Sequence, residues 1–205
     1  MLSIAYWGNI EYFAELFFLA ENGEVNVLLD ETFPKQSFRN SCEILGANGV
    51  LRLTIPVEGR SKNRKTKAIL ITDENWQRQH IHSIKSAYAR SPFYEYYADE
   101  VLGFYEENKT ARELSHFCIK NIELCLTLLQ KPIKLITNCE FEKGHSSDLR
   151  NRFKSGKKQL NFTEYYQTFS DRFAFEPNLS ILDLLFNLGP ESLNYILTQK
   201  NNLKS

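Results

Sequence analysis

The residues best suited to chemistry lie in the six-residue loop Lys35-Gln36-Ser37-Phe38-Arg39-Asn40, which follows an apolar run. The run from Val25 to Leu29 has the pattern of a buried strand, and loops that follow strand ends in α/β domains commonly hold ligands. A guanidinium close to an ammonium and a hydroxyl is suited to a phosphate or a carboxylate. The sequence therefore predicts an anion-binding loop, but no motif in it specifies a reaction.

A second candidate feature is Asp183, which lies among apolar residues of a later helical stretch, with Asn187 one turn further on. Burying a polar group without a partner costs about 2 kcal/mol or more, so both side chains need partners. Arg39 is an attractive partner for Asp183, and this pair can tether a helix to the loop, form part of a site, or do both. The candidate ligand-binding residues are Tyr6, Asn9, Lys35, Ser37, Arg39, Asn40 and Asp183.

The first part of the chain should position these residues with a strand, a helix and a second strand. Leu2 to Trp7 reads as a strand, an apolar stripe from Tyr12 to Ala20 reads as a helix, and Val25 to Leu29 is the second strand. Such a unit is right-handed with parallel strands. Residues 41–57 predict an antiparallel hairpin and Ala68 to Thr72 a further short strand, so the sheet should be mixed.

The hairpin prediction rests on Asn48-Gly49, a strong turn signal that would pair Ala47 with Val50. Alternation along the strands then places Cys42 on an apolar face, and a buried core thiol is favoured over a nucleophile for this residue. The expected face consists of Cys42, Ile44, Leu51, Leu53 and Ile55. The four cysteines have neither CxxC nor zinc-ligand spacing.

The second part of the chain reads as mainly helical, and residues 142–164 as a polar loop. Together these patterns predict an α/β fold in one domain over residues 1–205, with a mainly sheet-forming part at 1–72 and a mainly helical part at 73–205. The expected helices are one from Asp73 to Tyr88, one after Ser91-Pro92, one from the capping box Thr110 to Glu113 as far as Lys131-Pro132, Phe162 to Phe175, Ser180 to Leu188 and Glu191 to Leu197, with a short strand from Ile133 to Thr137.

The composition excludes several classes of partner. With 25 basic and 25 acidic residues, the chain has no net field to attract nucleic acid or an anionic membrane. No apolar run is long enough for a transmembrane segment, and the first residues lack the pattern of a signal peptide, so a cytoplasmic location is expected. His80 reads as a core or boundary histidine rather than a catalytic base, and no metal site is indicated. The basic run 60–67 is better explained by a solvated loop than by a phosphate clamp.

Seven strings, in the same order along nearly the whole chain, resemble the WbqC-like protein family. They are Tyr6 with Glu11-Tyr12-Phe13, the loop 35–40, Cys42-Glu43-Ile44, and residues 53–57, 76–80, 84–93 and 179–191. One departure is Ser41, where the family commonly has a second arginine. The resemblance implies a bacterial cytoplasmic protein associated with surface polysaccharide gene clusters, and it carries no established reaction.

Two classes of function follow. The first is a transferase that acts on an activated or amino sugar in surface-glycan assembly and binds an anionic small molecule at the loop. The second is a non-catalytic partner or scaffold of a glycan-assembly enzyme, with an exposed aromatic surface at residues 93–97. The chain lacks a GxGxxG motif, a P-loop and a nucleophile elbow, which argues against a nicotinamide dehydrogenase, a P-loop ATPase and an α/β-hydrolase. No motif assigns a cofactor.

Overall fold

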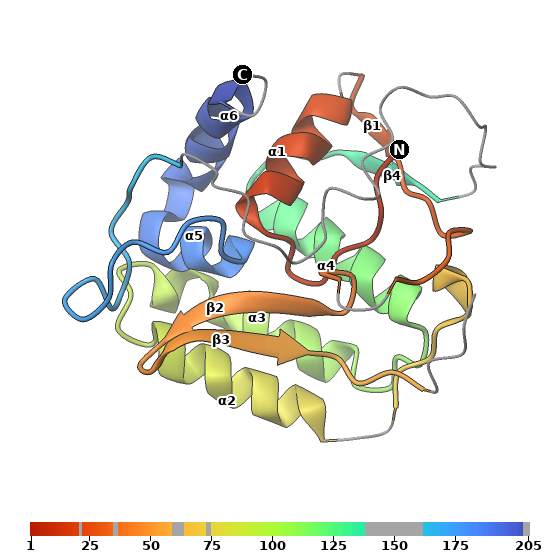
Figure 1. Ribbon diagram of the computed structural model, residues 1–205, viewed down its shortest axis with the longest axis horizontal. Helices are drawn as coiled ribbons and strands as arrows, with labels where there is room; N and C mark the ends of the chain where they lie inside the picture. The colour runs from red at the N-terminus through yellow and green to blue at the C-terminus, as the bar shows by residue number, and fades with distance from the viewer. Residues whose placement is uncertain (21, 35–36, 59–63, 73–74, 138–161, 203–205) are drawn as a thin grey trace.

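The computed structural model describes residues 1–20, 22–34, 37–58, 64–72, 75–137 and 162–202 (Figure 1). In Figure 1 a β-hairpin crosses the molecule below α1 and α5 and above α2. The elements are α1 (Ile10–Leu19), β1 (Glu24–Asn26), β2 (Ser41–Gly46), β3 (Gly49–Thr54), η1 (Thr66–Ala68), α2 (Trp76–Tyr88), α3 (Tyr94–Glu107), α4 (Leu114–Leu128), β4 (Lys134–Ile136), α5 (Ile181–Leu188), η2 (Gly189–Glu191) and α6 (Ser192–Asn202).

The α/β class is confirmed, with parallel and antiparallel pairing and with helices dominating the second half. β1 pairs with β4 in parallel, and β2 pairs with β3 as the antiparallel hairpin, in two separate two-stranded sheets. The expected first strand contributes one parallel bridge, between Leu2 and Val27. The segment does not form a longer β-ladder because its amides bond to different parts of the chain. The Leu2 amide donates to the Asn26 carbonyl, and the Tyr6 amide donates to the Phe38 carbonyl.

The hairpin is present, but its predicted register is wrong. Gly46 pairs with Gly49, so Ala47 and Asn48 form the loop, and Gly49 takes a φ of 100°. The shift moves the pairing by two residues, which preserves the faces of the strands. Four of the five expected residues, Cys42, Ile44, Leu53 and Ile55, are accordingly buried, whereas Leu51, near the turn on the outer strand, is 41% exposed.

Two helix predictions need correction. The helix expected from Thr110 begins at Leu114, because the backbone before it bonds to a neighbouring segment: Arg112 accepts from Ile71, and Glu113 forms a bridge with Leu70. Residues 162–175, expected to be helical, form extended and turn structure. Likewise, residues 68–72 contain isolated bridges rather than a strand. Asp73, Cys139 and most of the loop 142–164 lie outside the described residues.

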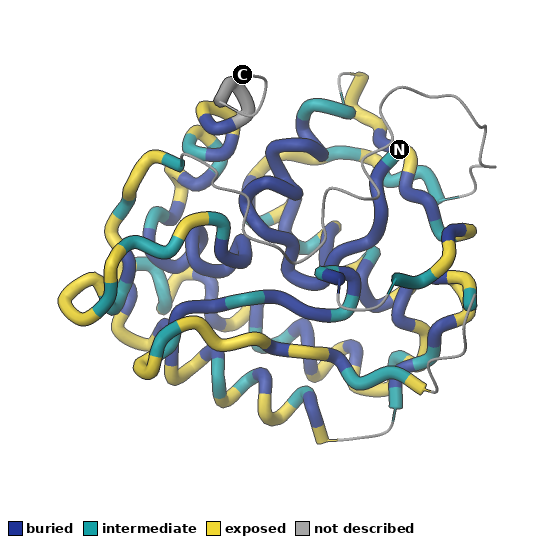
Figure 2. The backbone as a smooth tube through the Cα atoms, in the orientation of Figure 1, coloured by how far each residue is buried: buried dark blue, intermediate teal, exposed yellow. Residues whose placement is uncertain are grey.

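The core is built around the N-terminal segment, α1 and α5, which Figure 2 shows mostly in dark blue. Residues 10–17 of α1 and 181–187 of α5 are buried throughout. The two helices begin side by side, since Ile10 donates to the Leu179 carbonyl and Ile181 donates to the Gly8 carbonyl. Their start points are fixed locally by side-chain caps, Asn9 for α1 and Ser180 for α5.

The close approach of Gly189, at the end of α5, to the Phe93 ring can be tested by substitution. Gly189 has a φ of 57°, and a Cβ placed on it would lie 2.5 Å from the Phe93 ring, so Gly189→Ala should destabilise the protein by about 1–3 kcal/mol. Gly103, inside α3, is the matched control, because a Cβ there meets open space. Gly103→Ala should raise the unfolding free energy by about 0.5–1 kcal/mol. Urea denaturation measures both, and equal effects of the two substitutions would contradict this packing.

Candidate functional site

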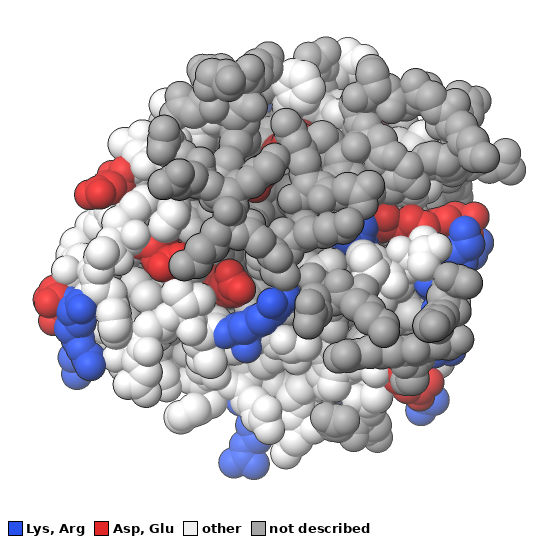
Figure 3. Space-filling model, in the orientation of Figure 1, with Lys and Arg blue, Asp and Glu red and all other residues white. Residues whose placement is uncertain are grey.

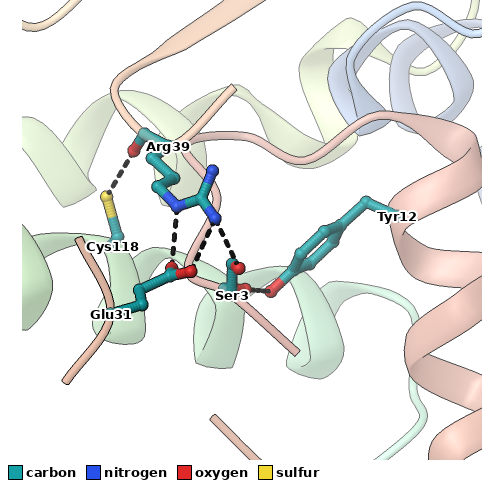
Figure 4. Close-up of polar contacts among 5 residues, drawn as sticks. All are labelled: Ser3, Tyr12, Glu31, Arg39 and Cys118. Atoms are coloured by element: carbon teal, nitrogen blue, oxygen red, sulfur yellow. Dashed lines mark hydrogen bonds and ion pairs between the residues drawn. The ribbon is translucent and has the colours of Figure 1, made fainter. Parts of the chain in front are cut away.

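Arg39 is buried in a bidentate ion pair and is not directed at solvent (Figure 4). Its Nε donates to Oε1 of Glu31 and its Nη2 to Oε2, each at 2.8 Å, and Nη2 also donates to the Ser3 hydroxyl at 2.8 Å. Arg39 is 3% exposed and Glu31 is 6% exposed. Two parallel bonds between a guanidinium and a carboxylate make a strong, directional contact. This pair ties the loop to the N-terminal segment.

The same cluster reaches two helices. The Tyr12 hydroxyl on α1 donates to the Ser3 carbonyl at 2.9 Å, and the Cys118 thiol on α4 donates to the Arg39 carbonyl at 3.3 Å (Figure 4). Burial raises the pKa of the Cys118 thiol well above its usual value. This cysteine is therefore a neutral core residue that helps to hold the loop.

The predicted pair between Arg39 and Asp183 is wrong. Asp183 is 1% exposed, and its carboxylate accepts hydrogen bonds from the Tyr88 hydroxyl at 3.1 Å, the Tyr165 hydroxyl at 2.6 Å and Gln167 Nε2 at 3.0 Å. Within the described ranges no Lys or Arg forms an ion pair with it. The sequence pointed to Arg39 because both groups needed a partner, but Glu31 lies closer to Arg39 along the chain.

Asp183 is a carboxyl group surrounded by neutral donors. Burial raises the pKa of Asp183, and the hydrogen bonds from Tyr165, Gln167 and Tyr88 partly oppose that rise. Its neighbour Asn187 donates from Nδ2 to the Asp183 carbonyl and accepts from the Thr168 hydroxyl. A carboxyl group of this kind can hold a proton, or exchange one with a nearby hydroxyl group.

Tyr6 is fully buried in a chain of hydrogen bonds. Its hydroxyl contacts Nδ1 of His80 at 2.7 Å and the Tyr105 hydroxyl at 2.5 Å, and Trp7 Nε1 donates to Tyr105 at 2.8 Å. The Thr54 backbone favours the charged form of His80, but burial outweighs this contribution. Burial lowers the pKa of His80 to about 4, so the ring is neutral at pH 7.

The other predicted ligand residues occupy different places. Asn9 caps α1 by accepting from the Tyr12 amide, and Asn40 donates from Nδ2 to the Ile55 carbonyl. Ser37 is buried, and its hydroxyl has no partner among the described residues. Lys35 lies outside the described residues. The structure thus divides the described candidates among the loop, the Tyr6 cluster, the α1 cap and the Asp183 cluster.

A second guanidinium lies beside the loop. Arg52 on β3 donates from Nε and Nη2 to the Ser41 hydroxyl, at 3.1 and 2.8 Å, and its guanidinium lies over the Phe38 ring. Ser41 therefore anchors an arginine that comes from the neighbouring strand. Glu31 and the tyrosines Tyr88, Tyr105 and Tyr165 were not recognised as site residues from the sequence. The partners of the three tyrosines are mostly far away along the chain, and no local motif marks Glu31 as the partner of Arg39.

Several other predictions are resolved by burial and contacts. Burial raises the pKa of the Cys42 thiol, which supports a core cysteine over a nucleophile. From the basic run, Lys65 and Lys67 contact Asp30, and residues 59–63 lie outside the described ranges. In the coloured part of Figure 3, acidic and basic side chains are interspersed. Of the aromatic segment 93–97, Tyr96 is 63% exposed whereas Tyr97 is buried.

The described residues contain no group of three His, Cys, Asp or Glu side chains that could hold a metal ion. No helix in the same part of the chain has both the length and the apolar character needed to cross a bilayer.

Comparison with known proteins gives a family and one distant relative. The model of the WbqC-like protein family matches residues 9–168 and 143–195. The chain is also similar to the uncharacterized protein Rv1507c of Mycobacterium tuberculosis (strain ATCC 25618 / H37Rv), with 24% identity over 197 residues that cover 82% of this chain and 84% of the relative. No solved structure gives a significant match.

A double-mutant cycle tests the buried ion pair. Arg39→Met should lower the unfolding free energy by about 3–5 kcal/mol because it leaves the Glu31 carboxylate buried without its partner, and adding Glu31→Leu should recover much of the loss. Lys134→Met, which breaks the exposed pair with Glu24, is the control and should change stability by less than about 1 kcal/mol. Additive losses in the double variant would show that the two side chains are not coupled.

His80 predicts a pH dependence of stability. Its pKa is about 4 when folded, below its value of about 6.5 in an unfolded chain, so the unfolded state binds more protons between these values. The contribution of His80 to stability is complete above pH 6.5, and about 3 kcal/mol of it should be lost as the pH falls to 4. His80→Gln should flatten that slope, and His82→Gln, at an exposed position of the same helix, should not. Wild-type slopes in both variants would refute the assignment.

Proposed function

The chain belongs to the WbqC-like protein family, and on this premise we propose that it acts in the cytoplasm in the assembly of a bacterial surface polysaccharide. In this proposal it is a transferase that works on an activated or amino sugar intermediate. Asp183 is its acid–base group, and the loop 35–40 binds the anionic part of the substrate. The family match supports the biological setting, and the chemistry of the Asp183 cluster supports the reaction class.

The carboxyl group of Asp183 carries the proposal. Transfer of a group to a sugar hydroxyl or amine requires a group that takes the proton from the attacking atom, and a positioned carboxylate can do this. Asp183 is buried, accepts hydrogen bonds from two phenols and an amide, and forms no ion pair with a described Lys or Arg. Buried carboxyl groups with a raised pKa are enriched at functional sites, which supports this role.

The loop has a separate part in the proposal. Activated sugars carry phosphate, which suits the ammonium of Lys35 and the buried Ser37 hydroxyl, for which no described residue provides a partner. Arg39 acts as a positioning residue, because its guanidinium is bound by Glu31 and Ser3. Asn40 has a similar role through its bond to the Ile55 carbonyl. A non-catalytic partner of a glycan-assembly enzyme remains the alternative, and the exposed Tyr96 would belong to its contact surface.

Asp183→Asn separates binding from chemistry. Nucleotide sugars should raise the melting temperature of the wild-type protein, because a ligand that binds only the folded state stabilises it. For the sugar that binds, Asp183→Asn should keep most of the shift but lose turnover by about 10²–10⁴-fold. Tyr96→Ala, at an exposed position, is the control and should keep both. Full turnover by Asp183→Asn would exclude the acid–base role, and absence of any sugar binding would favour the scaffold alternative.

A further inference from the structure

Two of the three donors to the Asp183 carboxylate come from one irregular segment, residues 162–177. In Figure 1 this segment is the blue loop at the left edge, outside α5, and in Figure 2 most of it is teal or yellow. It contains turns at 168–172 and no helix or strand. Gln167 is its buried residue, and Phe162 and Tyr165 are partly buried against the edge of the hydrophobic core. The segment is therefore held by polar contacts together with these two rings, and none of its apolar side chains is fully buried.

These polar contacts are made to side chains of two helices. On α5, Tyr165 and Gln167 bind Asp183, and the Thr168 hydroxyl donates to Asn187 Oδ1 at 3.0 Å. On α6, the Tyr195 hydroxyl donates to the Thr163 carbonyl, and Gln199 Nε2 donates to the Thr163 hydroxyl. The Tyr165 ring also lies against those of Tyr195 and Phe175. A segment held in this way can open without unfolding the helices below it.

The third donor belongs to the fixed part of the molecule. Tyr88 lies on α2, is fully buried, and stacks its ring on Phe186 of α5 with centroids 4.9 Å apart. Its hydroxyl would stay on Asp183 if the segment lifted. The opened site would then present a carboxyl and a phenol, and the Asp183 Oδ2 atom would have lost the two donors Tyr165 and Gln167. A ligand that excludes water from the site must supply two O–H or N–H donors to this oxygen, because a buried acceptor left unsatisfied is costly.

We propose that residues 162–177 form a strap over the Asp183 site, and that the Tyr165 hydroxyl and the Gln167 carboxamide occupy the positions of a substrate's hydroxyl and acylamide N–H. An N-acylated amino sugar carries both groups on adjacent carbons. The closed structure is then autoinhibited by its own side chains, and substrate enters when the strap opens. This inference rests on the proposed function, and it narrows the substrate class from activated or amino sugars to N-acylated amino sugars.

Chemical labelling of the Asp183 carboxyl tests the strap. Carbodiimide with glycinamide converts accessible carboxyl groups to amides, and peptide mass spectrometry measures the rate at residue 183. Labelling of the double variant Tyr165→Phe, Gln167→Leu should be about tenfold faster or more than in wild type, because two hydrogen bonds that close the strap are gone. Tyr166→Phe, at an exposed neighbouring position, should label at the wild-type rate. Equal rates in all three proteins would overturn the strap.

Hydrogen exchange on the wild-type protein checks the strap without a substitution. Amides of residues 163–170 should exchange much faster than those of α5, since the strap opens while the helix stays formed. Protection equal to that of α5 would show that the segment is a fixed part of the fold and would overturn the proposal, even if the double variant proved too unstable to label.

N-acetylglucosamine and glucose test the substrate class in the double variant. N-acetylglucosamine should slow labelling of Asp183 by occupying the vacant acceptor positions, and glucose, which lacks the amide, should protect less. Equal protection by the two sugars, or none, would overturn the assignment of an acylamide. These readouts do not depend on turnover, so a protein without transferase activity could still show the strap, and an active transferase could still lack it.

Discussion

The fold depends on how two buried carboxyl groups, those of Glu31 and Asp183, are stabilised away from water. Glu31 is matched by the Arg39 guanidinium in a bidentate pair, and a further bond from Arg39 to Ser3 reaches the N-terminal segment. Tyr12 and Cys118 extend these contacts to α1 and α4. Loss of one member of such a buried pair strongly destabilises the fold, so the pair fixes the position of Arg39. Arg39 is therefore a structural anchor for the residues beside it.

The Asp183 carboxyl group is stabilised by neutral hydrogen-bond donors instead of a cation. Phenols and an amide surround it, and no described Lys or Arg forms an ion pair with it, so its charge is stabilised less than that of Glu31. Burial consequently raises the pKa of Asp183. An apolar side chain at this position would leave the donors of Tyr88, Tyr165 and Gln167 without their acceptor, so the Asp183 carboxyl also holds these side chains in place. The two carboxylates thus differ in how they are stabilised: Glu31 by a guanidinium, and Asp183 by neutral donors.

Local signals in the sequence predicted the elements, and long-range partners explain most of the errors. Asn9 before α1 and Ser180 before α5 are caps that act within one turn, and both helices are found where these residues place them. Residues 162–175 carry aromatic side chains at near-helical spacing, yet Tyr165 and Gln167 turn toward Asp183, a contact that propensity cannot reveal. The predicted pair between Arg39 and Asp183 was wrong for the same reason. The sequence shows that a buried charged side chain needs a partner, but it does not show which residue that partner is.

The proton affinity of Asp183 is the most direct test of this account. A titration of the side-chain carboxyl of Asp183 by ¹³C NMR, assigned with Asp183→Asn, measures the pKa in the folded protein. We expect a pKa clearly above the value of about 3.9 for an ordinary aspartate, because the group is buried among neutral donors. A pKa at or below that value would show that the hydrogen bonds from Tyr88, Tyr165 and Gln167 outweigh burial. Such a carboxylate would be too weak a base for the proposed acid–base role.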